Sequence, residues 1–252
     1  MFFSSSSNWL FGKADTGKPT LFCLPYAGGG ASVYRNWNTH LSPLTGVVAI
    51  QLPGREERIN EARYYSIVDL VDAIFEAEAE DGPWFTKKSV LFGHSMGAKI
   101  AFEIAQRLEA EGRPPALLLV SGSRPPAMPS KRHICDLDDA DFDDELRHLA
   151  GTPEAILQEK ELMCLLRPLL RADFAMDENY ISSATLNIPI VAYAGDADDE
   201  VSEPDLSAWA KQTHSSFSSN IVPGDHFFLK KHEADFLSRL HSDLTHFLGE
   251  AS

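Results

Sequence analysis

The feature that most constrains the fold is a regular alternation of short apolar runs with longer amphipathic segments. Six runs have the length of a β-strand, at residues 20–24, 47–52, 89–92, 116–121, 188–195 and 217–222. The first five are apolar almost throughout, which is typical of strands that helices cover on both faces. Apolar residues recur at helical spacing in residues 67–75, 100–108 and 236–247. This alternation predicts an α/β fold with a mostly parallel, doubly wound sheet.

One long segment interrupts the alternation, because no strand-like run occurs between about residues 130 and 185. An acidic stretch before Phe142 suits the start of a helix and Gly151 suits its end, while Pro168 is expected to bend or end a second helix. We therefore expect one domain, residues 1–252, with a helical insertion at about residues 130–185. Ligands of α/β proteins bind at the carboxyl edge of the sheet, so we predict that the insertion is a lid rather than extra packing.

The charge of the chain excludes some classes of partner. A formal net charge of -15 argues against non-specific binding to nucleic acid or to an anionic membrane. The N-terminus lacks the basic region and cleavage site of a signal peptide, so we do not expect it to be one. Residues 1–8 are expected to be disordered. Cys23, Cys135 and Cys164 lack C-x-x-C spacing and are expected to be reduced thiols. We expect a cytoplasmic protein without a membrane span, and a monomer.

Two stretches suggest a bound ion or phosphate group, but neither has the residue spacing that such a site requires. The acidic cluster at residues 136–144 lacks the glycine and the distal glutamate of an EF-hand loop, so a capped helix start is expected instead of a metal site. The glycines at residues 28–30 resemble a phosphate-binding loop. Position 33 is Val, however, and no Walker lysine follows, so the sequence predicts neither a nucleotide nor another cofactor.

The segment Gly93-His94-Ser95-Met96-Gly97 follows a predicted strand and opens a predicted helix. By itself a G-x-S-x-G sequence is weak evidence, since it arises by chance in roughly one in ten chains of this length. Its position is that of a nucleophile elbow, where a serine at a sharp strand-to-helix turn needs small neighbours on either side. The helix N-terminus also presents free N–H groups to an anion that forms there. Ser95 is therefore the predicted nucleophile.

A serine hydroxyl needs a base to remove its proton. The chain has nine histidines, and position selects among them: His226 follows the last strand by four residues, where the base of such a fold arrives. His94 lies in the elbow and is expected to point away from Ser95. The other possibilities, His232, His241 and His246, fall on the last predicted helix and are expected to be surface residues.

The acid that orients the imidazole is expected after a strand as well. The loop after residues 116–121 contains no carboxylate, whereas the loop after Gly195 contains several. We predict Asp198 from its position three residues past Gly195, with Asp196 and Asp199 as rivals. The order serine, aspartate, histidine is that of the α/β-hydrolases. Backbone N–H groups of Met96 and Ala27 are the predicted oxyanion donors, Ala27 because it precedes three glycines that let a substrate approach closely.

Five stretches, in this order and spacing, resemble the type II thioesterases, which are stand-alone α/β-hydrolases associated with polyketide and nonribosomal peptide synthetases. These stretches are LFCLPYAGGGASVYRNW, QLPGREER, GHSMGA, LRADF and PGDHFFL. The resemblance runs from about Trp9 to the C-terminal helix. It implies hydrolysis of acyl thioesters on the phosphopantetheine arm of a carrier protein, with Ser95 acylated, His226 as base and then acid, Asp198 as its support, and the insertion as a mobile lid.

The chain departs from the family pattern at two positions. The family often has His where this chain has Tyr26, and Gly before the catalytic histidine where this chain has Asp225. Neither change removes a catalytic group, but Asp225 is a possible competitor for His226. Arg55 and Arg58 are expected to form structural ion pairs, with contact to an acidic carrier protein as the alternative.

Other functions use the same residues. An enzyme that releases a finished product, a hydrolase of acyl-CoA or small esters, and an acyltransferase would all keep this constellation. A non-catalytic α/β-hydrolase that binds a partner belongs to a different class. The presence of serine, histidine and carboxylate together disfavours it, since a binding module has no need of all three.

Overall fold

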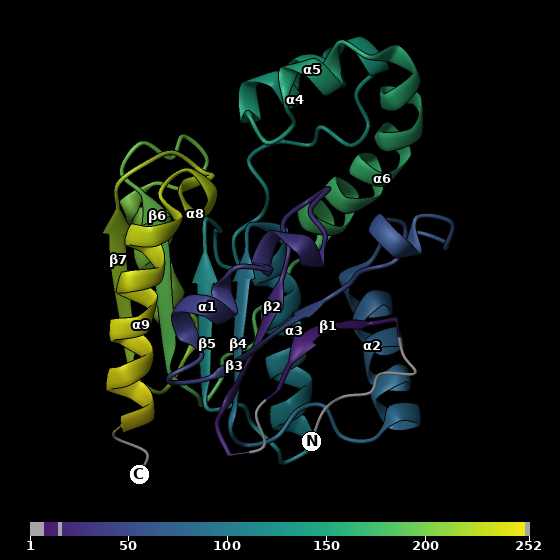
Figure 1. The fold of residues 1–252 in the computed structure, drawn as a ribbon. Coiled ribbons are helices and arrows are strands. Elements are labelled where there is room, and N and C mark those ends of the chain that lie inside the picture. Colours follow the sequence, from purple (N-terminus) through teal and green to yellow (C-terminus); the bar gives the residue numbers. More distant parts are fainter. Residues whose placement is uncertain (1–7, 15–16, 250–252) are drawn as a thin grey trace.

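A computed structural model describes residues 8–14 and 17–249 of the chain. Its centre is a seven-stranded sheet in the order β1-β3-β2-β4-β5-β6-β7, in which neighbouring strands are parallel except for β1 against β3 (Figure 1). The strands are β1 (Leu10–Lys13), β2 (Thr20–Leu24), β3 (Gly46–Ile50), β4 (Ser89–His94), β5 (Leu117–Ser121), β6 (Ile190–Gly195) and β7 (Phe217–Val222). The prediction of a mostly parallel, doubly wound sheet is confirmed.

Strand β1 is the one strand of this sheet that the sequence pattern did not reveal. It is short, and its Gly12 interrupts the apolar run with a backbone φ of 124°. A Cβ atom at Gly12 would lie 2.4 Å from the carbonyl oxygen of Val47 on the neighbouring strand, so only glycine permits this close antiparallel pairing. The strand therefore depends on its contact with β3 and not on a pattern of its own.

Helices cover both faces of the sheet, and each face has its own hydrophobic core. On one face, α2 (Ile67–Asp81) and α3 (Met96–Ala110) pack with residues such as Ile74 and Phe102. On the other face, α1 (Trp37–Leu41) and α9 (Glu233–Gly249) bury Trp37 and Phe236 against the strands. Shorter helices occupy the connections: η1 (Ala31–Tyr34), η2 (Glu56–Arg58), α7 (Glu203–Ser207), η3 (Ala208–Gln212) and α8 (Phe228–Lys231).

The helical insertion lies between β5 and β6 and consists of α4 (Asp139–Leu149), α5 (Glu154–Leu157) and α6 (Lys160–Asn179). Figure 1 shows α4 and α5 beyond the carboxyl ends of the central strands, with α6 running back toward the sheet. The expected acidic cap is present, because the Asp138 carboxylate accepts hydrogen bonds from the backbone N–H groups of Ala140 and Asp141, each at 3.0 Å. The insertion thus lies at the edge where ligands of such sheets bind.

The insertion also has a small core of its own, formed by Ile134, Phe142, Leu146, Leu157, Met163 and Leu170. Pro168 lies inside α6, and the helix continues past it to Asn179. Pro168 therefore does not end a helix, which was one of the two expectations. The tertiary contacts of α6 with α3 and α5 outweigh the backbone hydrogen bond that a proline removes.

All three cysteines are free. Cys23 lies in the centre of the sheet, where burial raises the pKa of its thiol well above the usual range, so it behaves as a small apolar residue. Within the described residues, no helix combines the length and apolar character that crossing a membrane requires. The expected disorder of residues 1–8 lies outside the described residues except for Asn8, which is part of a turn.

Candidate active site

Ser95 stands alone between the last residue of β4 and the first residue of α3, in a strained backbone conformation with φ 54° and ψ −122°. The two flanking glycines make this corner possible. A Cβ atom at Gly93 would lie 2.0 Å from the carbonyl oxygen of Gly97, and a Cβ atom at Gly97 would lie 2.2 Å from that of Leu24. No side chain fits at either position, so the turn has the geometry expected of a nucleophile elbow.

The predicted base and acid are in contact. Nδ1 of His226 lies 3.0 Å from Oδ2 and 3.2 Å from Oδ1 of Asp198. The Asp198 side chain is fully buried, and that of His226 is 13% exposed. A buried carboxylate at Nδ1 fixes the imidazole so that Nε2 is the nitrogen free to exchange a proton, and it stabilises the imidazolium once it forms.

The rival carboxylates have other positions. Asp198 is held by its own loop, since its Oδ1 also accepts the backbone N–H groups of Glu200 at 2.8 Å and Val201 at 3.2 Å. The Asp196 carboxylate instead accepts the backbone N–H of Gly224 at 2.8 Å. Asp199 is exposed and has no hydrogen bond to His226. Of the three, only Asp198 reaches the imidazole.

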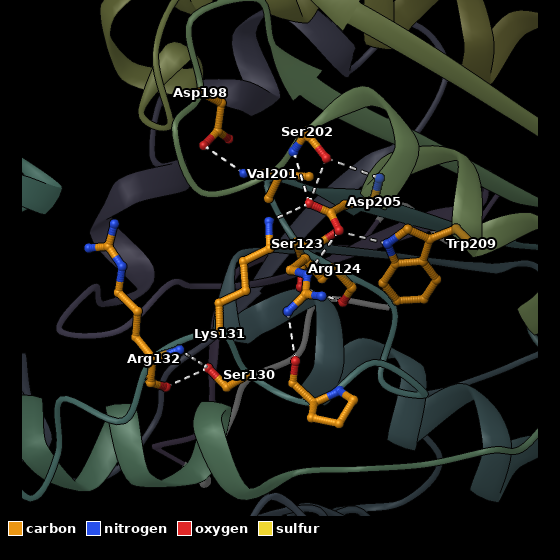
Figure 2. Close-up of polar contacts among 11 residues, drawn as sticks. Ser123, Arg124, Ser130, Lys131, Arg132, Asp198, Val201, Ser202, Asp205 and Trp209 are labelled. Carbon is orange, nitrogen blue, oxygen red and sulfur yellow. Dashed lines mark hydrogen bonds and ion pairs between the residues drawn. The ribbon is translucent and has the colours of Figure 1, made fainter.

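A second carboxylate, Asp205, braces the loop that carries Asp198 (Figure 2). It forms a capping box with Ser202 at the start of α7, and it accepts hydrogen bonds from Arg124 at 3.1 Å and Lys131 at 2.7 Å. Burial alone would raise the pKa of Asp205, but the hydrogen bonds from Lys131, Ser202 and Arg124 lower it below its ordinary value. Asp205 thus connects the loop that carries Asp198 to the loop after β5, which leads into the insertion.

Ser95 and His226 line the same cavity at the carboxyl edge of the sheet. Within the described part of the chain the two side chains are not hydrogen-bonded to each other. Bonds between a nucleophile and its base are often long until substrate is bound, so the shared cavity is the informative observation. The predicted base and acid are thus in contact, and Ser95, the predicted nucleophile, lines the same cavity as His226.

His94 is the last residue of β4 and is fully buried. Its Nδ1 lies 2.9 Å from Oγ of Ser121, and its ring centroid lies 5.1 Å from that of His226. Burial, followed by the charge of His226, lowers the pKa of His94 well below its usual range, so this imidazole stays neutral.

The two predicted oxyanion donors lie at the same end of the sheet. Met96 is the first residue of α3, where backbone N–H groups have no acceptor within the helix. Ala27 lines the cavity beside Ser95. The loop around Ala27 is held on both sides, because Gly29 N–H donates to the Tyr26 carbonyl at 2.8 Å and Gly28 N–H donates to Asp173 at 2.7 Å.

Asp173 is a buried carboxylate that sequence reasoning did not identify. It extends from α6 and is 1% exposed at its side chain, and Arg55 binds it with two parallel hydrogen bonds of 2.7 and 2.8 Å. The same guanidinium donates to the Gly29 carbonyl at 3.1 Å. Arg55 and Asp173 therefore clamp the loop that carries Ala27 onto the insertion. The motifs containing both residues were visible in the sequence, but nothing in either motif indicated that they pair.

Arg58 has a separate structural role. It donates to Glu61 at 2.9 Å and to the Gln51 carbonyl at 2.8 Å, and its guanidinium stacks 3.9 Å from the centroid of the Trp9 ring. Both arginines of the LPGREER motif are thus in ion pairs, as expected. Neither is positioned as a free cation for a partner.

Asp225 does not compete for His226. Its carboxylate accepts the backbone N–H of Phe227 at 3.0 Å and pairs with Lys231. Burial would raise the pKa of Asp225, yet these hydrogen bonds lower it overall. Tyr26, the other departure, packs edge-on against Phe227 with ring centroids 5.1 Å apart and forms part of the cavity wall.

The cavity runs from Ser95 into the space below the insertion. Its apolar wall includes Met128, Ile134, Leu146, Leu149, Leu170 and Phe174, most of them from the insertion. Charged residues also line it, among them Lys99, Arg124, Lys131, Arg132, Asp177 and Glu178. Among the described residues, no cluster of three or more His, Cys, Asp or Glu side chains has the arrangement of a metal site.

A mostly parallel sheet with a serine at this strained strand-to-helix turn, and with helices inserted over its carboxyl edge, defines an α/β-hydrolase. Residues 19–244 match the thioesterase domain family, which is nine-tenths of the chain. The chain belongs to the thioesterase family, and it is a hydrolase that acts on thioester bonds.

Named relatives agree with this assignment. The chain is similar to the gramicidin S biosynthesis protein GrsT of Aneurinibacillus migulanus, with 40% identity over 91% of each chain. It is also similar to the thioesterase PikA5 of Streptomyces venezuelae, with 36% identity over 89% of this chain and 81% of the relative. Among solved structures, RedJ, a thioesterase from the prodiginine biosynthetic pathway in Streptomyces coelicolor, superposes with a TM-score of 0.82 and 35% identity over 89% of each chain. The resemblance to type II thioesterases is confirmed.

Proposed function

We propose that the protein hydrolyses acyl thioesters from the phosphopantetheine arm of carrier proteins, with Ser95 as nucleophile, His226 as base and Asp198 as its support. The observation that carries the proposal is the buried contact between Asp198 and Nδ1 of His226 on the wall of the cavity that Ser95 opens into. The names of similar proteins support the substrate class, because GrsT is a gramicidin S biosynthesis protein and YbtT is a type II thioesterase from the yersiniabactin NRPS/PKS biosynthetic pathway.

The reaction has two halves. In the first, Oγ of Ser95 attacks the thioester carbonyl while Nε2 of His226 takes its proton, and the N–H groups of Ala27 and Met96 stabilise the oxyanion. The C–S bond then breaks, and the thiol leaves with the proton that His226 held. In the second half, His226 takes a proton from water, whose oxygen attacks the acyl-serine. The free acid departs and the proton returns to Ser95.

The helical insertion contributes most of the apolar wall of the cavity, so we propose that it is a lid that encloses the acyl chain. Within one domain, such a lid excludes bulk water from the acyl-serine while leaving the catalytic groups on the rigid sheet. The substrate brings the phosphopantetheine, so the residues described here supply the chemistry without a further cofactor.

Clearing of acyl groups from stalled carriers is the role that we propose. Release of a finished product, cleavage of acyl-CoA, and acyl transfer use the same chemistry and differ in the group that carries or accepts the acyl chain. Acyl and peptidyl carrier domains are the proposed partners. A cytoplasmic location and a monomeric state stay predictions.

The test compares one acyl group on two carriers. Rates of hydrolysis of an acyl carrier protein and of the matching acyl-coenzyme A are measured with the wild-type enzyme and with Ser95→Ala. We expect a higher kcat/KM on the carrier protein and loss of activity in Ser95→Ala. Equal efficiency on both substrates contradicts carrier recognition, and wild-type turnover by Ser95→Ala contradicts the covalent mechanism.

A further inference from the structure

The acyl cavity contains a buried lysine close to the reactive serine. Lys99 lies in the first turn of α3, four residues after Ser95. Both residues line the cavity. Lys99 is only 5% exposed, which is rare for a lysine because its charge loses solvation on burial.

The Lys99 ammonium has one partner residue, Asp177 in the last turn of α6. It donates to the Asp177 carbonyl at 2.7 Å and pairs with Oδ1 of the same residue at 3.0 Å. An ammonium has three N–H donors, so one remains without an acceptor in the described part of the chain. The Asp177 side chain is 25% exposed and lines the cavity too. The pair therefore offers the cavity both a donor and an acceptor.

A neighbouring carboxylate, Glu178, differs from Asp177 because both of its oxygens accept hydrogen bonds from the backbone. Glu178 also lines the cavity, but its two carboxylate oxygens accept the backbone N–H groups of Ile134 at 2.8 Å and Cys135 at 3.2 Å. It holds the start of the insertion in place. Among the described residues, the Lys99 ammonium keeps one N–H without an acceptor, and the Asp177 carboxylate pairs with Lys99 alone. Both oxygens of Glu178, in contrast, bind the backbone.

The ion pair reduces the favourable binding free energy that a purely apolar ligand gains from the rest of the cavity wall. Leu146, Leu170 and Phe174 suit an alkyl chain. A saturated chain lying along them would displace water from Lys99 and Asp177 without replacing its hydrogen bonds. A chain with an oxygen substituent at the right depth would replace them. Since a buried ion pair is often no more stabilising than apolar residues of the same size, stability alone does not account for it.

From these contacts we infer that Lys99 and Asp177 form a polar subsite that selects acyl groups bearing a hydroxyl or keto oxygen over saturated chains of the same length. The inference rests on the proposed function, because it assigns the substrate class of that same cavity. Lys99 donates to the substituent oxygen, and Asp177 holds the ammonium in place and accepts from a hydroxyl.

The experiment measures a preference ratio. Pantetheine thioesters of octanoate and of octanoates hydroxylated at C3, C6 or C8 are hydrolysed under identical conditions, and the released thiol is quantified. These positions avoid the readily formed five- and six-membered lactones. The ratio is kcat/KM for the best hydroxylated substrate divided by kcat/KM for octanoyl. We expect a wild-type ratio above about five, and a decrease of about tenfold in Lys99→Met, as for loss of one hydrogen bond to a charged group.

Two further variants make the outcome decisive. Asp177→Asn keeps the shape of the side chain and removes its charge, so it is expected to lower the ratio while the protein stays folded. Arg107→Met removes another cation of α3, one that pairs with Asp72 away from the cavity, and it is expected to keep the wild-type ratio.

The inference is overturned if the wild type prefers octanoyl, or if Lys99→Met and Asp177→Asn lower the melting temperature while leaving the ratio unchanged. In the latter case the pair only braces α6 against α3. Failure of the proposed function has a different signature, since the wild type would then hydrolyse none of the four thioesters.

Discussion

The clamp between Arg55 and Asp173 gives the most quantitative prediction. Asp173→Asn replaces the carboxylate by an amide of the same shape and leaves a buried guanidinium without its counter-charge. Both side chains are at most 5% exposed, so solvent cannot compensate. Breaking a buried pair in this way costs about 3–5 kcal/mol of the free energy of unfolding. For a domain of this size, each kcal/mol lowers the melting temperature by about 2–4 °C, so we expect a decrease of roughly 6–20 °C.

The same substitution is expected to affect catalysis through the loop that carries Ala27. The Asp173 carboxylate accepts the Gly28 N–H directly, and Arg55 holds the Gly29 carbonyl. If the loop shifts and Ala27 N–H no longer reaches the oxyanion, kcat falls by about 10²–10³-fold, which is the usual effect of losing one such donor. KM for a fixed acyl-pantetheine substrate should change less, because the donor acts mainly in the transition state.

A matched variant separates the clamp from ion pairs in general. Glu61→Gln makes the same chemical change to the partner of Arg58, but the Glu61 side chain is 41% exposed, so about 0–1 kcal/mol is expected. Both variants are measured by thermal unfolding and by steady-state kinetics at a temperature where they are folded. The reasoning is refuted if Asp173→Asn is no less stable than Glu61→Gln, or if it loses stability and keeps the wild-type kcat.

Two further predictions concern the imidazoles. Asp198→Asn should lower kcat by roughly 10⁴-fold, because His226 loses the partner that fixes its tautomer. Asp196→Asn should lower kcat far less, because the Asp196 carboxylate binds the Gly224 N–H and not His226. Similar losses of kcat in steady-state assays would contradict the assignment of Asp198 as the acid. Burial holds the pKa of His94 well below its value of about 6.5 in the unfolded chain, so the unfolded chain binds a proton first as the pH falls. The contribution of neutral His94 to stability is therefore fully present above about pH 6.5 and is lost as the pH falls below it. Thermal unfolding between pH 7.5 and 5 should show a weaker pH dependence in His94→Gln than in the wild type.

Much of the central fold was predictable because local patterns specified it. Each of the six predicted strands overlaps a strand of the sheet, and the helical spacing of residues 67–75 and 100–108 lies within α2 and α3. A fully apolar strand must be covered on both faces, so its sequence carries its environment with it. Strand β1 lacked such a pattern because Gly12 breaks it and pairing with β3 supplies the stabilisation. Pro168 was misleading for the same reason, since packing of α6 overrides a local preference.

The predicted site residues were chosen by their place in the chain order of strands. Ser95 and His226 each follow a strand whose carboxyl end meets the same edge, so their approach to one cavity follows from the topology. The choice among Asp196, Asp198 and Asp199 depended on a three-residue offset, and the loop geometry distinguishes them by their hydrogen-bond partners.

The sequence by itself determined the order of strands and helices, the two glycines that the corner at Ser95 requires, and the family to which the chain belongs. These features depend on near neighbours along the chain, whose sizes and polarities can be read directly. The tertiary structure alone decided the long-range pairings: Arg55 with Asp173, 118 residues apart, and Lys99 with Asp177, 78 residues apart. Which charges meet inside a protein depends on how distant segments pack, and side chains with several possible partners carry no local sign of the one they find.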